Sequence, residues 1–231
     1  MRTALLVIAT GERYHQYVNP LLESAREFFV EHDAWVWTDS LAAAGQIDAK
    51  FVLTKEPLGY PNETLYRYHT ILQQRPLLAK YDYLFYLDVD MRLVAPVGKE
   101  IFSNNITACL HPGYVNEVGS PERRPESMAA IPYNAKNKYF CGGFNGGFSG
   151  AFLGMAAELA WCIDKDTEKG VLAVWHDESH LNRYLYDHPP SKILDPSYCY
   201  PEGAGDHYLN KWRASGINPT PKILALTKES R

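Results

Sequence analysis

The stretch Tyr81–Leu93, YDYLFYLDVDMRL, joins a buried-type strand to a pair of carboxylates. Tyr83–Leu87 is aromatic and aliphatic and lacks glycine and proline, which favours a fully buried strand. Alternate side chains of an extended chain face the same side, so Asp88 and Asp90 would point together while Val89 returns to the core. Open α/β sheets bind ligands at the carboxyl ends of such strands, and paired carboxylates suit a hard divalent cation. A solvated acidic turn is the alternative interpretation.

The segments on both sides of this strand alternate between strand and helix patterns, which is typical of an α/β fold. Before it, the sequence predicts strands at 3–10, 34–37 and 51–54, a helix over 15–32, and a helix over 62–79 that is capped by Asn62 and kinked at Pro76. After it, strands are predicted at 107–111, 193–194 and 223–226, with helices over 151–166 and 175–186. The helix over 62–79 leads directly into the carboxylate-bearing strand, which predicts a parallel βαβ crossover.

Two further segments indicate a functional site. Residues 112–130 form a long, unpatterned stretch rich in glycine, proline and glutamate, and loops of that length in compact domains usually have a function. Residues 139–150, YFCGGFNGGFSG, contain five glycines. Glycine allows positive φ and close approach of a ligand to the backbone, although a hairpin turn or bulge is an alternative.

The bulk properties exclude several classes of protein. The 231 residues suffice for one sizeable domain, and no repeat or linker divides them. A net charge of −4 does not favour a nucleic-acid or anionic-membrane partner. The apolar run near the N-terminus is too short to span a membrane, and the four cysteines fit no zinc spacing. We therefore predict a soluble cytoplasmic protein with no transmembrane segment and with reduced thiols.

Trp175–His180, WHDESH, is the second stretch that predicts chemistry. A helix N-terminus favours the anionic form of a carboxylate there, which suits a nucleophile or a charge stabiliser. His176 and His180 stand four residues apart, close to the H-E-x-x-H pattern of zinc peptidases. The second position, however, is Asp177 rather than glutamate, and no third ligand is evident. A zinc hydrolase remains one alternative. The other is that this stretch is simply a capped, polar helix start with no catalytic role.

Taken together, these motifs resemble glycosyltransferase family 6, which includes the histo-blood-group transferases and α-1,3-galactosyltransferase. The matching segments occur in the family's order and are FYLDVD (85–90), LHPG (110–113), ERRPES (122–127), AAIP (129–132), two glycine pairs (142–143 and 146–147), WHDESHLN (175–182), KILDPSYC (192–199) and TKE (227–229). They cover most of the chain after Tyr83, whereas the N-terminal quarter matches mainly in its strand pattern. The resemblance implies the single-domain GT-A fold over 1–231, a Rossmann-like mixed sheet flanked by helices, with a nucleotide-binding half (1–90) and an acceptor and catalytic half (91–231).

The resemblance also implies a reaction. Members transfer galactose or N-acetylgalactosamine (GalNAc) from a UDP-sugar to the 3-hydroxyl of a galactose-terminated, in some cases fucosylated, acceptor with retention of configuration. Asp88 and Asp90 would hold Mn²⁺, or alternatively Mg²⁺, against the diphosphate. Microbial members often replace both aspartates by asparagine, so the retained DVD predicts metal dependence in what resembles a soluble microbial or viral member. A non-catalytic glycan-binding module on the same fold is a further alternative.

Site residues follow from the matching motifs. Glu178 matches the family's proposed nucleophile, and the resemblance implies that it would also contact the acceptor. The donor-binding positions are Ile8, Ala9, Thr10, Tyr14, Arg67, Asp88, Val89, Asp90, Cys141, Gly142, Gly143, His176, Asp177 and Lys228. The other acceptor-binding positions are His111, Ser120 and Trp175. Gly143 matches the position that separates the two donors; its small size leaves room for an N-acetyl group, so we expect UDP-GalNAc, with UDP-galactose as the alternative.

Overall fold

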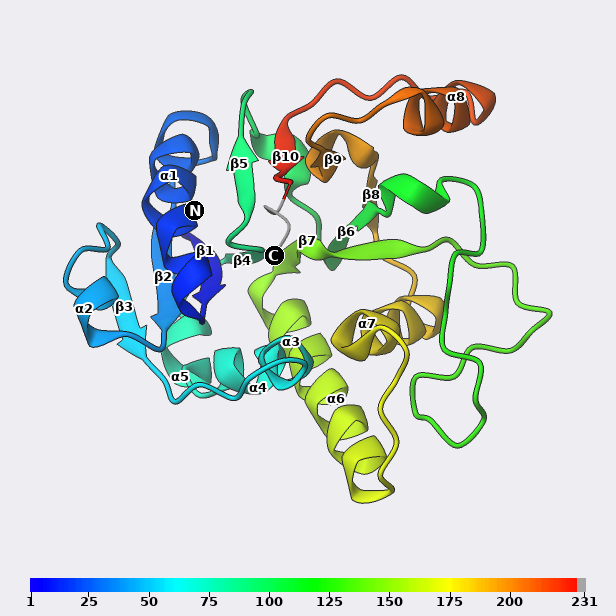
Figure 1. Cartoon of the computed structure of the whole chain (residues 1–231), viewed down its shortest axis with the longest axis horizontal. Coiled ribbons are helices and arrows are strands. Elements are labelled where there is room, and N and C mark those ends of the chain that lie inside the picture. Colours follow the sequence, from blue (N-terminus) through cyan, green and yellow to red (C-terminus); the bar gives the residue numbers. More distant parts are fainter. Residues whose placement is uncertain (228–231) are drawn as a thin grey trace.

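The computed structural model describes residues 1–227. Its main layer is a seven-stranded sheet with the order β3-β2-β1-β4-β7-β6-β8 (Figure 1). The strands are β1 Thr3–Ala9, β2 Asp33–Thr38, β3 Phe51–Thr54, β4 Tyr83–Leu87, β6 Ile106–Leu110, β7 Phe140–Phe148 and β8 Lys192–Leu194. Strand β7 runs antiparallel to both of its neighbours, and the other pairings are parallel. The predicted α/β fold with a mixed sheet in one domain is therefore confirmed.

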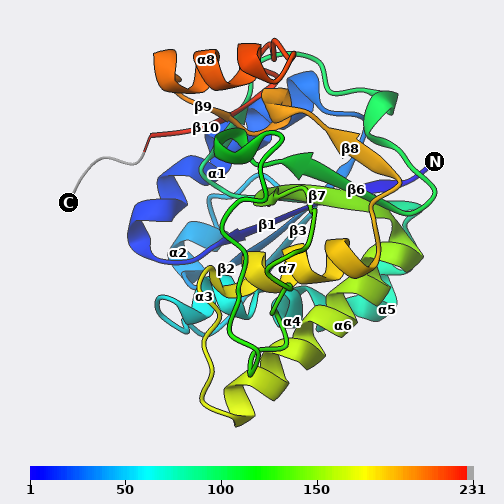
Figure 2. The same ribbon diagram turned by 90° about the vertical axis from the view of Figure 1, so that its right-hand side faces the viewer.

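Helices cover both faces of this sheet, because β1 is apolar on both sides. Leu5 and Val7 pack with α1 (Glu12–Phe28), whereas Ala4 and Leu6 pack in a second core. That second core lies against α4 (Arg67–Leu72), α5 (Arg75–Leu78), α6 (Ser149–Glu168) and α7 (His176–Asp187). Figure 2 shows α6 and α7 below the sheet and α8 (Asp206–Ala214) above it.

A small second sheet follows the carboxylate motif directly. It has the order β5-β10-β9, with β5 at Met91–Leu93, β10 at Ile223–Ala225 and β9 at Tyr200–Pro201. The C-terminal strand β10 thus pairs with the residues that come immediately after Asp90, and the Leu226 N–H donates to the Asp90 carbonyl oxygen at 2.9 Å. The sequence predicted β10 but not its partners.

The region 62–79 differs from its prediction. Three short helices replace the single one: α3 (Asn62–Leu65), α4 and α5. The capping prediction for Asn62 is wrong, because Asn62 is the first residue of α3 and Pro61 precedes it. Pro76 lies in the first turn of α5, where a missing N–H costs little. The predicted parallel crossover is nevertheless confirmed, because β4 lies parallel to β1.

The glycine-rich segment is a strand rather than a turn. Gly142, Gly143 and Gly146 lie in β7, and only Gly147 of the two pairs has a positive φ, at 138°. A Cβ on Gly146 would lie 2.3 Å from Cδ1 of Phe85 and 2.4 Å from the Leu84 carbonyl oxygen. Close packing between β7 and β4 therefore requires glycine there. None of the described helices is both long and apolar enough to cross a lipid bilayer.

Candidate active site

A cleft of about 1070 Å³ opens at the carboxyl ends of β1 and β4. It lies at the edge that the sequence predicted, since the ends of parallel strands meet there. Seven of the predicted donor-binding residues line it: Ile8, Thr10, Tyr14, Arg67, Asp88, Val89 and Asp90. Ala9 lies directly behind it with its side chain buried in the core.

A turn, rather than strand alternation, brings the two carboxylates to the cleft. Strand β4 ends at Leu87, and the Met91 N–H then donates to the Asp88 carbonyl oxygen at 3.2 Å. Val89 is buried as expected, and both aspartates are half-buried and line the cleft. The Tyr86 hydroxyl donates to Asp88 Oδ1 at 2.7 Å and so fixes the orientation of that carboxylate.

Arg67 connects the cleft to the start of α7. Its side chain is buried, and its Nη1 donates to the Gly142 carbonyl oxygen at 3.0 Å and to Asp88 Oδ1 at 3.3 Å. Its Nε lies 2.7 Å from Asp177 Oδ2. One guanidinium therefore holds the end of β4, the middle of β7 and the first turn of α7, three segments far apart in the sequence.

The ion pair alters both pKa values. Burial alone would lower the pKa of Arg67, but the adjacent Asp177 and Asp88 carboxylates raise it overall, so the guanidinium stays charged. Asp177 is completely buried, and burial raises its pKa to about 7 against the opposing effect of Arg67. The sequence predicted a helix N-terminus that favours ionised carboxylates, but burial outweighs that effect here.

Glu178 is held by the glycine strand. Its Oε2 accepts from the Gly142 N–H at 2.8 Å, and burial raises its pKa to about 7 although this hydrogen bond favours the anion. Because Gly142 also accepts from Arg67 through its carbonyl, a single peptide segment positions both groups. Glu178 therefore gains or loses its proton near neutral pH.

The two histidines of WHDESH lie in different places. His176 begins α7 with φ at 51°, and its ring packs edge-on against Tyr60 of the cleft at 5.4 Å. His180 is buried, with Nε2 3.6 Å from Asp166 Oδ2, and burial lowers its pKa to about 4. Since the helical spacing does not bring the two rings together, the geometry does not support the zinc-peptidase alternative.

Of the predicted acceptor residues, Trp175 contacts the backbone of Glu178, and His111 packs against Tyr139. His111 contacts the ring of Tyr139 at 5.7 Å between centroids, and burial, reinforced by the nearby Glu178, raises the pKa of Tyr139. Trp175 is 49% exposed and accepts from the Glu178 N–H through its carbonyl oxygen at 3.0 Å. Ser120 is partly exposed in the long loop. Lys228 lies outside the described residues.

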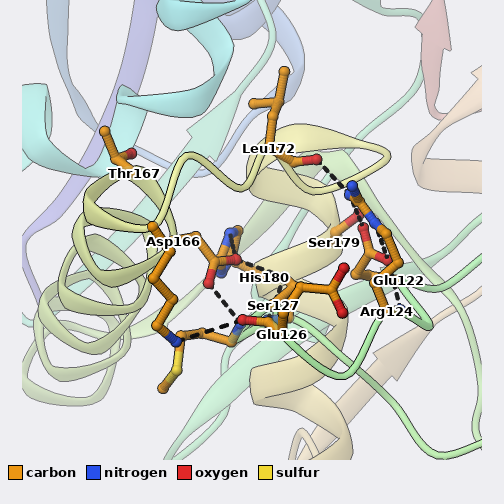
Figure 3. A network of polar contacts seen from close by, with 12 residues as sticks. Glu122, Arg124, Glu126, Ser127, Asp166, Thr167, Leu172, Ser179 and His180 are labelled. Atoms are coloured by element: carbon orange, nitrogen blue, oxygen red, sulfur yellow. Dashed lines mark hydrogen bonds and ion pairs between the residues drawn. The ribbon is translucent and has the colours of Figure 1, made fainter.

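The long loop is fastened to α6 and α7 by a polar network (Figure 3). Glu122 is buried; its Oε2 accepts from Arg124 Nη2 at 2.7 Å and from the Val174 N–H at 2.9 Å, just before α7. Farther along, the Ser127 hydroxyl donates to Asp166 Oδ2 at 2.5 Å. The loop and the start of α7 are therefore fixed relative to each other.

The residues at the turn suit a divalent cation. Asp88 and Asp90 provide the hard oxygen atoms that Mg²⁺ and Mn²⁺ prefer. Among residues 1–227 no group of three or more histidine, cysteine, aspartate or glutamate side chains is placed to hold a metal ion. A two-carboxylate site that is completed by ligand oxygens is the arrangement expected for a metal bound together with phosphates.

The structure adds residues that the motif reasoning missed. Asp39 follows β2 and lines the cleft, where its Oδ2 accepts from the Gly11 N–H at 2.8 Å. Tyr60 and Tyr86 line it as well. Asp39 could have been found from its place at the end of a predicted parallel strand, whereas Tyr60 lies in an irregular segment without any pattern.

Comparisons with known proteins identify the family that this chain resembles. The model of glycosyltransferase family 6 matches residues 2–215. The histo-blood group ABO system transferase 2 of Rattus norvegicus is 32% identical over 209 residues, which are 84% of this chain and 62% of the rat protein. Human globoside alpha-1,3-N-acetylgalactosaminyltransferase 1 is 31% identical over 208 residues, 84% of this chain and 59% of that protein. Human alpha-1,3-galactosyltransferase 2 is 29% identical over 126 residues, 53% of this chain and 37% of that protein. The chain thus spans about three fifths of the length of the first two relatives.

Proposed function

Because the chain belongs to glycosyltransferase family 6, we propose that it moves GalNAc from UDP-GalNAc to the 3-hydroxyl of a β-galactoside, with retention and with Mn²⁺. Arg67 is the observation that supports this proposal most directly. It links Asp88 at the cleft to Asp177 and, through Gly142, to Glu178. A leaving-group site and a candidate nucleophile are thereby held in one rigid arrangement, as group transfer requires.

Asp88 and Asp90 would hold the metal, and Mg²⁺ could take the place of Mn²⁺. When bound, the cation neutralises negative charge that develops on the departing diphosphate. Arg67 contributes fixed positive charge beside Asp88, and its burial keeps that charge from being screened by solvent. The Tyr86 hydroxyl keeps Asp88 Oδ1 in place during the reaction.

Glu178 would face the sugar carbon from the side opposite the diphosphate. In its anionic form it stabilises the positive charge on that carbon, either as a covalent nucleophile or as a charge partner. The Gly142 N–H orients the carboxylate through Oε2. His176 would contact the donor sugar, whereas Asp177, which is completely buried against Arg67, would act by holding that guanidinium in place. Trp175 offers an exposed side chain for the acceptor, together with His111 and Ser120.

Gly143 supports GalNAc as the donor sugar. A Cβ added to Gly143 would lie 2.4 Å from Met91 Cε and 3.1 Å from Asp88 Oδ2, so it would point toward the turn that carries Asp88. Because Met91 Cε occupies that space here, the expectation of GalNAc rests on the match of Gly143 to the family position that separates the two sugars, and on its closeness to Asp88. UDP-galactose is the second candidate, because a relative carries that transferase name.

A paired donor assay tests the proposal. The purified chain receives UDP-GalNAc or UDP-galactose, each with lactose or 2′-fucosyllactose, first with Mn²⁺ and then with EDTA. We expect transfer from UDP-GalNAc that EDTA abolishes. Transfer from UDP-galactose alone would overturn the donor assignment, and transfer that survives EDTA would overturn the metal assignment. UDP binding without transfer or hydrolysis under any condition would overturn the enzymatic assignment and favour a glycan-binding module.

A further inference from the structure

Arg13 and Tyr14 form a stacked pair in the cleft. Both residues line it, and both lie in the first turn of α1. The guanidinium carbon of Arg13 lies 4.9 Å from the centre of the Tyr14 ring, and Arg13 Nη2 donates to the Tyr14 hydroxyl at 3.3 Å. Adjacent side chains of a helix do not normally face each other, so this contact directs Arg13 toward the ring. Arg13 is itself exposed, so a ligand in the cleft can reach its guanidinium.

A fixed turn presents this pair to the cleft. Gly11 connects β1 to α1 with φ at 84°, a conformation that favours glycine. Its N–H donates to Asp39 Oδ2 at 2.8 Å, and Asp39 Oδ1 lies 2.8 Å from His15 Nε2. Asp39 therefore ties the residues on both sides of Arg13 and Tyr14 to the end of β2. The pair has a defined place before any ligand binds, which lowers the entropic cost of binding.

The two guanidinium groups of the cleft differ in their partners. Arg67 is buried and forms ion pairs with Asp88 and Asp177. The guanidinium of Arg13 makes no ion pair with a carboxylate among residues 1–227, and its hydrogen bond goes to the neutral Tyr14 hydroxyl. A guanidinium offers several N–H donors in one plane. Arg13 therefore keeps both donors and a planar face for a ligand.

The charges around Arg13 favour an uncharged part of the ligand. Under the proposed function, the diphosphate lies with the metal at Asp88 and Asp90, at the end of β4. Strand β1 lies between β4 and β2, so the rest of a bound nucleotide can extend along the cleft past Arg13 toward Asp39. Glu12 and Asp39 line the cleft beside Arg13 and would repel a phosphate there. A pyrimidine ring carries no charge, and a guanidinium stacks well on such a ring.

We propose that Arg13 is a nucleoside-binding residue, whose guanidinium stacks on the pyrimidine ring of UDP and has Tyr14 on its opposite face. The identity of the nucleotide rests on the proposed function. The stack adds planar contact and cation–π attraction to the base, and neither depends on the phosphates. The family motifs assign Tyr14 to the donor but not Arg13, so this contact follows from the structure of this chain alone.

Binding of three ligands to the full chain separates the base from the phosphates. Titration calorimetry with Mg²⁺ present measures the dissociation constants of UMP, UDP and inorganic pyrophosphate. We expect Arg13→Met to weaken UMP and UDP by the same factor of about five, the usual size of an exposed cation–π contact, and to leave pyrophosphate unchanged. Arg75→Met removes an exposed guanidinium outside the cleft and should change none of the three. Weaker pyrophosphate binding, or unchanged UMP binding, in Arg13→Met would overturn the proposal.

A second variant tests the planar group separately from its charge. Arg13→Lys keeps the positive charge but lacks the flat guanidinium, so it should weaken UMP and UDP about as much as Arg13→Met does. If Arg13→Lys instead binds UMP as tightly as the unmodified chain, charge alone is sufficient and the stack is excluded.

Transfer assays keep this inference apart from the proposed function. Arg13→Met should raise KM for the UDP-sugar about fivefold and leave kcat nearly unchanged, because the base is bound equally in the ground state and the transition state. An unchanged KM in a chain that transfers sugar would overturn the role of Arg13 while the proposed function stands. Nucleotide binding that depends on Arg13, without any transfer, would overturn the proposed function while the stack stands.

Discussion

Arg67 and Asp177 form a buried ion pair, with Nε 2.7 Å from Oδ2 and with both side chains almost completely shielded from solvent. Removing one partner of such a pair leaves an uncompensated charge in a medium that solvates it poorly. The pair also sets the position of α7 relative to β4. Both the stability of the chain and the geometry of the candidate site therefore depend on it.

The first prediction concerns stability. Arg67→Met should lower the free energy of unfolding by about 3–5 kcal/mol, because the Gly142 carbonyl oxygen loses its buried donor and Asp88 and Asp177 lose their shared counter-ion, so that Asp177 takes up a proton at neutral pH. Urea denaturation at neutral pH measures this change. Arg26→Met, which removes an exposed pair with Asp48, should cost less than about 1 kcal/mol and serves as the control. Equal losses in the two variants would contradict this account of Arg67.

The second prediction concerns Glu178. Glu178→Gln preserves the shape of the side chain but removes its charge, so UDP binding should be retained while turnover falls by at least about a hundredfold. Calorimetry measures UDP binding, and a radiolabelled donor assay measures turnover. Turnover close to that of the unmodified chain would exclude Glu178 from the chemistry.

The third prediction is a pH dependence. Burial raises the pKa of Glu178 to about 7, so the carboxyl is protonated below that pH and anionic above it. If the anion is the active form, kcat/KM should rise as pH increases through about 7 and then level off. The residual activity of Glu178→Gln should lose the part of this inflection that belongs to Glu178, while the adjacent Asp177, whose pKa burial also raises to about 7, still titrates. A profile that falls as pH rises through the same range would assign the opposite protonation state.

The fourth prediction concerns the metal. Replacing Asp88 and Asp90 together by asparagine should abolish Mn²⁺-dependent transfer, because amide oxygens bind a divalent cation more weakly than carboxylates do. Calorimetric titration of UDP with and without Mn²⁺ should also lose its metal-dependent component. Asp39→Asn removes a carboxylate that lies elsewhere in the same cleft and should preserve the response to Mn²⁺. An unchanged Mn²⁺ response in the double variant would place the metal elsewhere.

The fifth prediction concerns donor choice. Gly143→Ala should shift the preference toward UDP-galactose by about 1–3 kcal/mol, the usual effect of one methyl group in a pocket. The end of the Met91 side chain can move away from the new methyl, so the variant should fold. Gly146→Ala meets the backbone of β4 instead and should be destabilised without a specific change in donor ratio. Ratios of kcat/KM for the two donors provide the measurement.

The strand predictions held where the hydrophobic pattern was strong. Tyr83–Leu87 and Phe51–Thr54 coincide with β4 and β3 residue for residue. The glycine segment could not be recognised as a central strand from the sequence. Its glycines are needed because β4 packs closely against β7, and this contact joins residues far apart in the sequence. The helix predicted over 62–79 is instead three short helices, which end at Leu65, Leu72 and Leu78, and local periodicity did not indicate these ends.

Motif reasoning found the carboxylates of the candidate site but not the groups that control them. Asp88, Asp177 and Glu178 were identified from the sequence, and Arg67 was assigned to the UDP. Its contact with Asp177 appears only when α4 and α7 are placed on the same face of the sheet. Burial likewise explains why the pKa of Glu178 is raised, although the helix terminus alone would lower it.

The antiparallel strand β7 also constrains how the chain can fold during synthesis. Strand β4 pairs with β7 along its whole length, and β6 reaches the rest of the sheet only through β7. A nascent chain that has not reached Phe140 therefore leaves one edge of β4 without hydrogen-bond partners, and such edges attract other strands. The first 90 residues include the strand ends that line the cleft, but they cannot complete the sheet alone. A ribosome that pauses before β7 would expose an aggregation-prone intermediate, and expression at a lower temperature is the practical remedy.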